Sequence, residues 1–257
     1  MTALRSSTSR MESPTEDYKI QSFDQDTQML LKTALKDPGS VNLEKVSNII
    51  IDQSLKDQMF SKEAGRICYT IVQAEAKQNN GSVFRRNLLN RLQQEFKNRE
   101  EMRKCSLQEW VCFVTFICNV FDYLKVNNMP MLALVHPVFD CLMRLAQPDA
   151  LLNEAEVRID PPYKEKALFS NYRTDPLTFL LQVDCLVLQL HRIGEQLENA
   201  NRPRMDELFF QLRDGFLLQE GLSSMSRLLL LELLEFRAGG WSLSSTADKY
   251  YYSEIAE

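Results

Sequence analysis

The sequence predicts an all-α protein in which about five antiparallel helix pairs stack as one right-handed α-solenoid. Its 257 residues are 44% hydrophobic and 25% charged, an ordinary composition for a globular chain. Eight glycines are few for a β protein, which needs turn residues every 8–12 positions or so. Apolar residues recur at helical spacing, and the segments end at breakers such as Asp37-Pro38-Gly39 and Asn201-Arg202-Pro203.

Ten helices are expected from this periodicity. When the insertion at 158–182 is left out, successive helix pairs start about 36 to 52 residues apart. This spacing is close to the ~40–47 residues of HEAT-type repeats. Each pair is expected to bury its apolar face on the next, with a closed, non-repeating bundle as the alternative. The expected helices are 22–36, 42–55, 58–77, 82–102, 107–126, 130–147, 183–200, 204–216, 223–238 and 246–253.

The domain organisation follows from the segments without helical period. Residues 1–17 are expected to be a disordered tail, 18–253 a single repeat domain and 254–257 a C-terminal tail. Residues 158–182, with three prolines and no helical period in their first half, are expected to form an inserted loop. The N-terminus lacks the apolar region of a secretory signal, and the six cysteines lie mostly in apolar segments. A cytosolic or nuclear protein is expected.

The stretch WVCFVTFICNVFDYL, residues 110–124, has three interpretations: a membrane span, a cysteine site or a buried helix. Its apolar run is short of the ~20 residues that cross a bilayer and includes Asn119 and Asp122. Thr115, Asn119 and Asp122 share one helical face, which we expect to be the wet face of an otherwise buried helix.

Metal and enzyme chemistry find little support in the sequence. Cys105, Cys112 and Cys118 are seven and six residues apart, so no C-x-x-C pair forms, and the chain has only two histidines, His136 and His191. None of the common nucleotide-binding, hydrolase or zinc-protease motifs is present. We expect no catalytic residue, no cofactor and no metal.

One basic cluster stands out in this acidic chain of net charge −5. Residues 85–104 carry seven Lys or Arg against three Glu, and Arg86 and Lys97, eleven residues apart, share a helical face. This pattern suits a patch for RNA or for an acidic partner, and equally an ordinary solvated face. Arg85, Arg86 and Lys97 are the candidate contact residues, and direct RNA binding is the alternative function.

The C-terminal third resembles a known family. The segments CLVLQLHRIGEQLENANRPRMDELFFQL (185–212) and LSSMSRLLLLELLEFRAGGW (222–241) are similar to the last two helical pairs of the middle domain of eukaryotic initiation factor 4 gamma. The likeness extends more loosely over about residues 18–241 and is greatest to the small members that consist of this domain alone. The matching positions are Gly194, Leu197, Pro203, Arg204, Met205, Asp206, Arg227, Leu234 and Trp241.

The resemblance implies a HEAT-type fold and a non-enzymatic translation adaptor. It also implies binding to the histone messenger stem-loop-binding protein, translation initiation factors and a DEAD-box helicase, with homodimerisation and mainly indirect contact with RNA. No membrane contact is expected. On the late repeats, the candidate partner-binding residues are Arg202, Arg204, Asp206 and Arg237, and capping or surface solvation is the alternative role of each.

A second motif lies inside the expected loop. YKEKALF, residues 163–169, fits the Tyr-x-x-x-x-Leu-apolar pattern by which short helices bind the cap-binding initiation factor. Its candidate residues are Tyr163, Leu168 and Phe169. Because the chain has eight tyrosines and many leucines, such a match also arises readily by chance.

Overall fold

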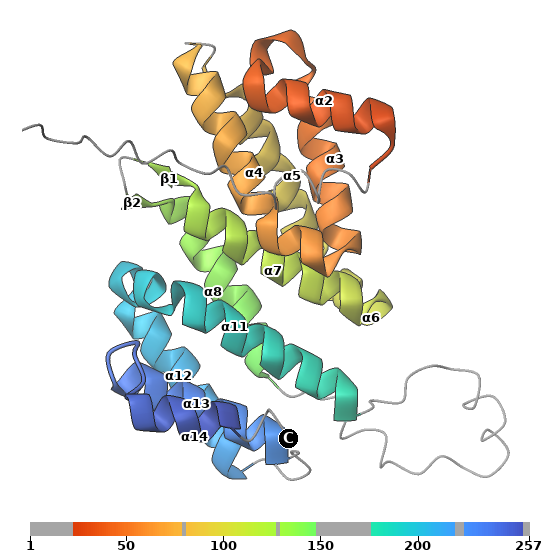
Figure 1. Cartoon of the computed structure of the whole chain (residues 1–257). Helices are drawn as coiled ribbons and strands as arrows, with labels where there is room; N and C mark the ends of the chain where they lie inside the picture. Colours follow the sequence, from red (N-terminus) through yellow and green to blue (C-terminus); the bar gives the residue numbers. More distant parts are fainter. Residues whose placement is uncertain (1–22, 79–80, 127–128, 148–175, 219–223, 254–257) are drawn as a thin grey trace, which may run out of the picture.

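Two rows of helices stack along one axis in the computed structural model (Figure 1). The structure describes residues 23–78, 81–126, 129–147, 176–218 and 224–253. The all-α, HEAT-like solenoid expected from the sequence is confirmed. In order, the elements are α2 (Gln25–Lys36), the 3₁₀ turn η1 (Pro38–Ser40), α3 (Leu43–Lys56), α4 (Gln58–Lys77), α5 (Val83–Lys97), α6 (Arg99–Cys105), α7 (Leu107–Tyr123), β1 (Lys125–Val126), β2 (Met129–Pro130), α8 (Leu132–Ala146), α11 (Pro176–Ala200), α12 (Arg202–Leu218), α13 (Ser224–Ala238) and α14 (Ser245–Ser253).

Contacts between helices define the two rows. In the inner row, α4 packs on α7, α7 on α11 and α11 on α13. In the outer row, α3 packs on α5 and α8 on α12, whereas α5 and α8 are less closely packed together. The repeats are therefore built mainly from α3 with α4, α5 and α6 with α7, α8 with α11, and α12 with α13. This leaves α2 and α14 at the two ends rather than inside pairs.

Side-chain caps set several helix starts. Asp24, Asn42 and Asp57 each accept a hydrogen bond from a backbone N–H in the first turn of α2, α3 and α4. These caps satisfy N–H groups that have no partner within the helix. The buried Glu75 caps α5 from a neighbouring helix, because its carboxylate accepts hydrogen bonds from the N–H groups of Val83 and Phe84.

The helix α7 is the centre of the core. Every residue from Trp110 to Phe121 is buried, because α3, α4, α6, α8 and α11 all pack against it. A helix enclosed on all sides needs apolar residues around its whole circumference, which explains the density of the 110–124 stretch. Within the described residues, no helix is both long and apolar enough to cross a bilayer.

Thr115, Asn119 and Asp122 were expected to form the solvent-exposed face of α7, and this prediction is wrong for the first two. Thr115 and Asn119 are buried against neighbouring helices rather than exposed. The Thr115 hydroxyl lies 3.7 Å from the Cys185 sulfur, and Asn119 donates to the backbone carbonyl of Lys62. Asp122 is half-buried and accepts hydrogen bonds from Arg192 at 2.8 Å and from Gln196 at 2.9 Å. Polar side chains that find partners inside the core can lie on a buried face.

Three expected boundaries also need correction. The helix expected over 82–102 is divided at Asn98 into α5 and α6, and residues 125–126 pair with 129–130 as two short antiparallel strands rather than helix ends. Residues 176–182 of the loop expected over 158–182 belong to α11 instead, and residues 158–175 lie outside the described residues. Pro176 is well suited to the first position of a helix, where its missing N–H costs no hydrogen bond. The tails 1–17 and 254–257 lie outside the described residues.

Candidate functional site

Some basic side chains of the cluster at 85–104 are paired or buried in the structure, and others are exposed. Arg91 pairs with Glu95 at 2.7 Å and with Asp52 at 2.9 Å. Arg99 lies over the Phe96 ring at 4.1 Å, and the side chain of Arg103 is buried. Arg86 and Lys97 are exposed, and neither forms an ion pair within the part of the chain that the structure describes. The half-buried Arg85 likewise has no ion pair there.

A groove opens in the outer row where α5 and α8 diverge. We call it the α5–α8 groove: it has a volume of about 330 Å³, its floor includes Ile117 of α7, and its walls are mostly apolar. Two amides, Asn90 and Gln93, lie on the same helical face as Arg86 and Lys97, since the four are spaced by four, three and four residues. The lining residues are Leu89, Asn90, Leu92, Gln93, Phe96, Ile117, Ala133, Leu134 and Pro137.

The groove also offers hydrogen-bonding groups to a ligand. Asn90 and Gln93 are exposed, and no hydrogen bond to another side chain or to the backbone occupies their amides among the described residues. On the opposite wall, Pro137 lies inside α8 and has no N–H to donate to the carbonyl of Ala133. An apolar channel edged by amides, with cations near both ends of its α5 wall, is chemically suited to a short peptide.

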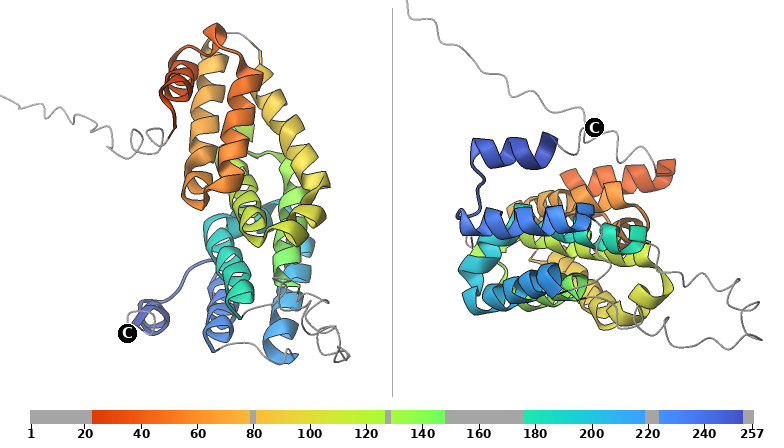
Figure 2. Two further views of the ribbon diagram at one scale, coloured as in Figure 1. Left: turned by 90° about the vertical axis from the view of Figure 1, so that its right-hand side faces the viewer. Right: turned by 90° about the horizontal axis from the view of Figure 1, so that it is seen from below.

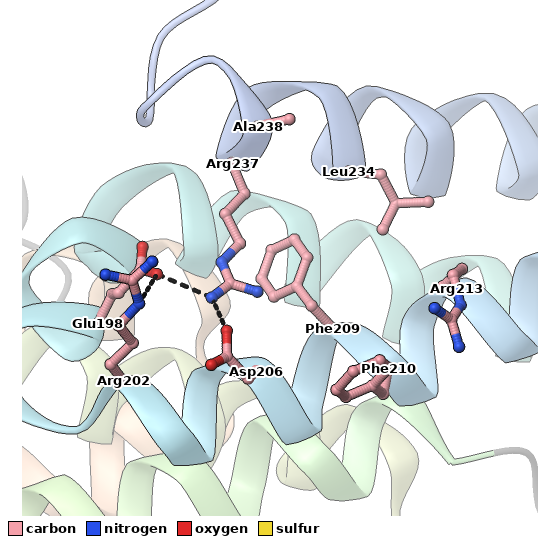
Figure 3. Close-up of a pocket in the computed structure, with 9 residues that line it drawn as sticks. All are labelled: Glu198, Arg202, Asp206, Phe209, Phe210, Arg213, Leu234, Arg237 and Ala238. Atoms are coloured by element: carbon pink, nitrogen blue, oxygen red, sulfur yellow. Dashed lines mark hydrogen bonds and ion pairs between the residues drawn. The ribbon is translucent and has the colours of Figure 1, made fainter.

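A second hollow, which we call the α12–α13 pocket, has a volume of about 670 Å³ (Figure 3). Figure 3 shows Arg237 reaching from α13 between two carboxylates, Glu198 and Asp206. The Arg237 nitrogen lies 2.8 Å from Glu198, and its guanidinium lies 4.6 Å from the Phe209 ring centre. Arg202 is largely exposed at 4.0 Å from Glu198. Three of the four late-repeat candidates therefore meet here: Arg202, Asp206 and Arg237.

Arg204 is not part of this pocket. Its guanidinium lies 2.7 Å from Asp140 of α8 and 3.1 Å from Glu207, so it joins α12 to α8 on another side. The far end of the pocket is more open to a ligand: Phe210 is 55% exposed, and Arg213 lies 4.9 Å from its ring centre. Phe210 was not predicted as a site residue: the sequence shows an aromatic followed by an arginine one turn later, but the exposure of the ring depends on the packing of α12.

Trp241 anchors the end of α13 through two residues that line this pocket, Glu198 and Phe209. Its indole N–H donates to Glu198 at 2.6 Å, and its ring meets Phe209 and Phe236 edge to face. Its backbone has φ 61°, following Gly240 at φ 72°, so the chain turns sharply to place the ring over Gly194. Glu198 of α11 thus joins that helix to α13 through Arg237 and to the turn after α13 through Trp241.

The carboxylate of Glu198 should make the anchoring of Trp241 sensitive to acid. Burial opposes ionisation, but hydrogen bonds from Arg237 and Trp241 and the charge of Arg237 together lower the pKa of Glu198 below its ordinary value of 4.5. Because the pKa of Glu198 is lower in the folded state, the bonds of its carboxylate stabilise the fold fully above about pH 4.5. That stabilisation is lost as the pH falls through the folded-state pKa. We expect Trp241 fluorescence to shift to the red below pH 4.5, and Glu198→Gln to remove most of that pH dependence. A wild-type signal that is flat from pH 6 to pH 3 would contradict this.

The cysteines and histidines form no site in the described residues. Cys68, Cys112, Cys118, Cys141 and Cys185 are buried, and Cys105 is exposed. Burial raises the pKa of the Cys185 thiol to about 12, which keeps it in the unreactive protonated form. His191 stacks on Phe236 at 4.1 Å, and His136 is exposed on α8. No group of three metal-binding side chains occurs among the residues described. Tyr163, Leu168 and Phe169 lie outside the described residues.

Comparisons with known proteins agree along nearly the whole chain. The family model described as "MIF4G domain" matches residues 10–239. The chain is 73% identical over 242 residues to "MIF4G domain-containing protein B" of Danio rerio, covering 94% of this chain and 97% of that protein. It is 62% identical over 242 residues to "MIF4G domain-containing protein" of Homo sapiens, with the same coverage. Identity to the Mus musculus protein of that name is 61% over 246 residues, 96% of this chain and 99% of the relative.

Proposed function

Because the chain belongs to the MIF4G domain family, we propose that it is a non-enzymatic translation adaptor that binds the histone messenger stem-loop-binding protein. MIF4G domains mediate protein interactions in translation, and proteins that carry them are translation-related adaptors. In the proposed role the chain joins that partner to translation initiation factors and thereby promotes translation of replication-dependent histone messengers.

The α5–α8 groove carries this proposal. An adaptor holds a partner by surface contacts, and a solenoid offers extended surfaces on which a short peptide can lie. The apolar walls would bury one or two large side chains of the peptide, and Asn90 and Gln93 would bond to its backbone. Arg86 and Lys97 on the same face of α5 favour a peptide with acidic residues at its ends, since opposite charges steer the encounter.

An adaptor also needs a second surface. The α12–α13 pocket shares no lining residue with the α5–α8 groove, so the two can be occupied together. We assign the second surface to a DEAD-box helicase, with Phe210, Arg202 and Arg213 as contacts, and RNA would be bound mainly through the partners. Homodimerisation and residence in both cytoplasm and nucleus belong to the same proposal. Light scattering of the purified chain would test the dimer.

Filling the groove tests the proposal directly. Ala133 is exposed and lines the groove, so Ala133→Phe places a ring in the channel without disturbing the core. We expect this variant to bind purified stem-loop-binding protein about tenfold or more weakly than wild type, because truncating or blocking a central contact commonly costs over 1.4 kcal/mol or so. Isothermal titration calorimetry measures the change.

His136→Phe is the matched control, since His136 is exposed on the same helix but does not line the groove. The control should bind as wild type does, and both variants should retain the wild-type melting temperature. Equal affinity of wild type and Ala133→Phe would contradict docking in the groove.

Direct RNA binding by the cluster at 85–104 is the second candidate function. Arg86 and Lys97, which form no ion pair with the described residues, favour it, and the pairing of Arg91 with carboxylates weakens it. Phosphate binding falls steeply with salt, whereas peptide docking in an apolar channel does not. Affinity purification from cytosol with and without ribonuclease distinguishes the two candidate functions. A protein-binding adaptor retains its partners after ribonuclease treatment, whereas partners held through RNA are lost.

A further inference from the structure

The last helix, α14, is attached to the solenoid by very little. Figure 2 shows it standing off from the body at the end of an extended segment that follows α13. The family match ends at residue 239, before α14 begins. Among its described side chains, Tyr251 is buried and Ala247, one turn earlier, is half-buried, while the others are exposed. The helix thus docks along a single short stripe.

Tyr251 is the main contact of that stripe. It is only 4% exposed, and its hydroxyl donates to the Glu235 carboxylate of α13 at 2.7 Å. The ring of Tyr250 meets it edge to face at 5.2 Å. Burial, followed by the hydrogen bond to Glu235, raises the pKa of Tyr251, so the hydroxyl remains a neutral donor.

A helix of nine residues cannot maintain itself in water. Isolated helices shorter than about 12–15 residues are marginal even when their sequences favour helix. The persistence of α14 therefore depends on its docking, and the docking depends on Tyr251. The two states of this element are a docked helix and a released, largely unfolded segment.

The surroundings of Tyr251 oppose negative charge. Glu235 accepts its hydrogen bond, and the carboxylate of the buried Glu232 also acts on it from α13. A phosphate on the Tyr251 oxygen would remove the donated proton and place about two negative charges beside two carboxylates. The α14 side contributes Asp248 and Lys249, whose charges balance. The docked state would lose its main bond and gain repulsion.

We propose that Tyr251 is a phosphorylation site and that its modification releases α14 from α13. A tyrosine kinase acts on the released segment, where the hydroxyl is accessible, and traps it there. The γ-phosphoryl group of ATP moves to the Tyr251 oxygen: an O–P bond forms, the bond to the ADP oxygen breaks and the phenolic proton leaves. Release frees the Glu235 carboxylate of α13 from the Tyr251 hydroxyl.

Amide hydrogen exchange of the full chain tests the release. Tyr251→Phe loses only the hydrogen bond and should speed exchange at 248–253 about tenfold, in keeping with a bond to a charged acceptor. Tyr251→Glu should bring these amides to the rate of an unfolded peptide. Tyr250→Phe is the control at the neighbouring exposed tyrosine: it keeps the ring that meets Tyr251 and should change the rate much less than Tyr251→Phe does. Unaltered exchange in α11 and α12 shows that the solenoid is still folded.

The modification has its own readout. The wild-type chain is incubated with the catalytic domain of a non-receptor tyrosine kinase and ATP, and the site is read by fragment mass spectrometry. Phosphate on Tyr251 together with loss of protection in α14 supports the proposal. Phosphate on Tyr250 alone, unprotected α14 in the unmodified chain, or wild-type protection in Tyr251→Glu would overturn it.

Discussion

Replacing Gly65 by alanine is expected to destabilise the protein by about 3 kcal/mol or more, the upper range for overpacking a core. Gly65 of α4 lies where that helix crosses α7, and an added Cβ would overlap the side-chain oxygen of Asn119. It would also lie 2.5 Å from the Asn119 carbonyl oxygen, which is backbone and cannot rotate away. The two helices must move apart, and α7 is the centre of the core.

Urea unfolding followed by circular dichroism measures this loss, which corresponds to a fall in Tm of about 6–12 °C for a chain of this size. The double variant Gly65→Ala with Asn119→Ala is the control. It removes the side-chain overlap but not the backbone contact. Measured against Asn119→Ala alone, which also lacks the hydrogen bond to Lys62, the added Gly65→Ala should therefore still destabilise the chain, but by less than in the wild type. A Gly65→Ala variant as stable as wild type would mean that the close crossing of α4 and α7 is wrong.

Gly194→Ala is expected to have the second-largest effect, at about 2–4 kcal/mol, because it expels a large aromatic side chain from its contacts. A Cβ at Gly194 would overlap the Trp241 ring and lie 2.6 Å from its Cε3 atom. Trp241 would then leave Phe209 and Phe236, and its N–H would lose Glu198. Since the loss is local to the last repeat, Trp241 emission should shift to the red before the rest of the chain unfolds.

A double-mutant cycle with Trp241→Ala isolates this contact. Once the ring is absent, Gly194→Ala has nothing to overlap, so the double variant should be no less stable than Trp241→Ala alone. Additive losses from the two substitutions would show that Gly194 matters for another reason.

The sequence predicts the helical architecture well because the solenoid is built from local signals. Apolar spacing and breakers locate most helices, and side chains such as Asn42 and Asp57 cap them where the pattern begins. The start of α11 escaped prediction because 176–182 follow a proline-rich segment. The buried state of Thr115 and Asn119 escaped it because a polar residue on a helix is satisfied only by partners distant in sequence, such as Lys62 and Cys185.

The candidate surfaces were only partly predictable for the same reason. Arg202, Asp206 and Arg237 were selected from the sequence and do meet, but Arg204 turns to Asp140 of α8, 64 residues away. The α5–α8 groove could not be seen, since it depends on how far α5 and α8 diverge. Its only sequence signal was that Asn90 and Gln93 share the helical face of Arg86 and Lys97.

Protection mapping of the complex tests the central claim that this chain is an adaptor with a peptide-binding groove. Hydrogen exchange is measured for the full chain alone and with saturating stem-loop-binding protein. We expect slower exchange in α5 and in α8 around Ala133 and Pro137, with the α12–α13 pocket unchanged and free for a second partner. Protection confined to α12 and α13, or none anywhere, would contradict it.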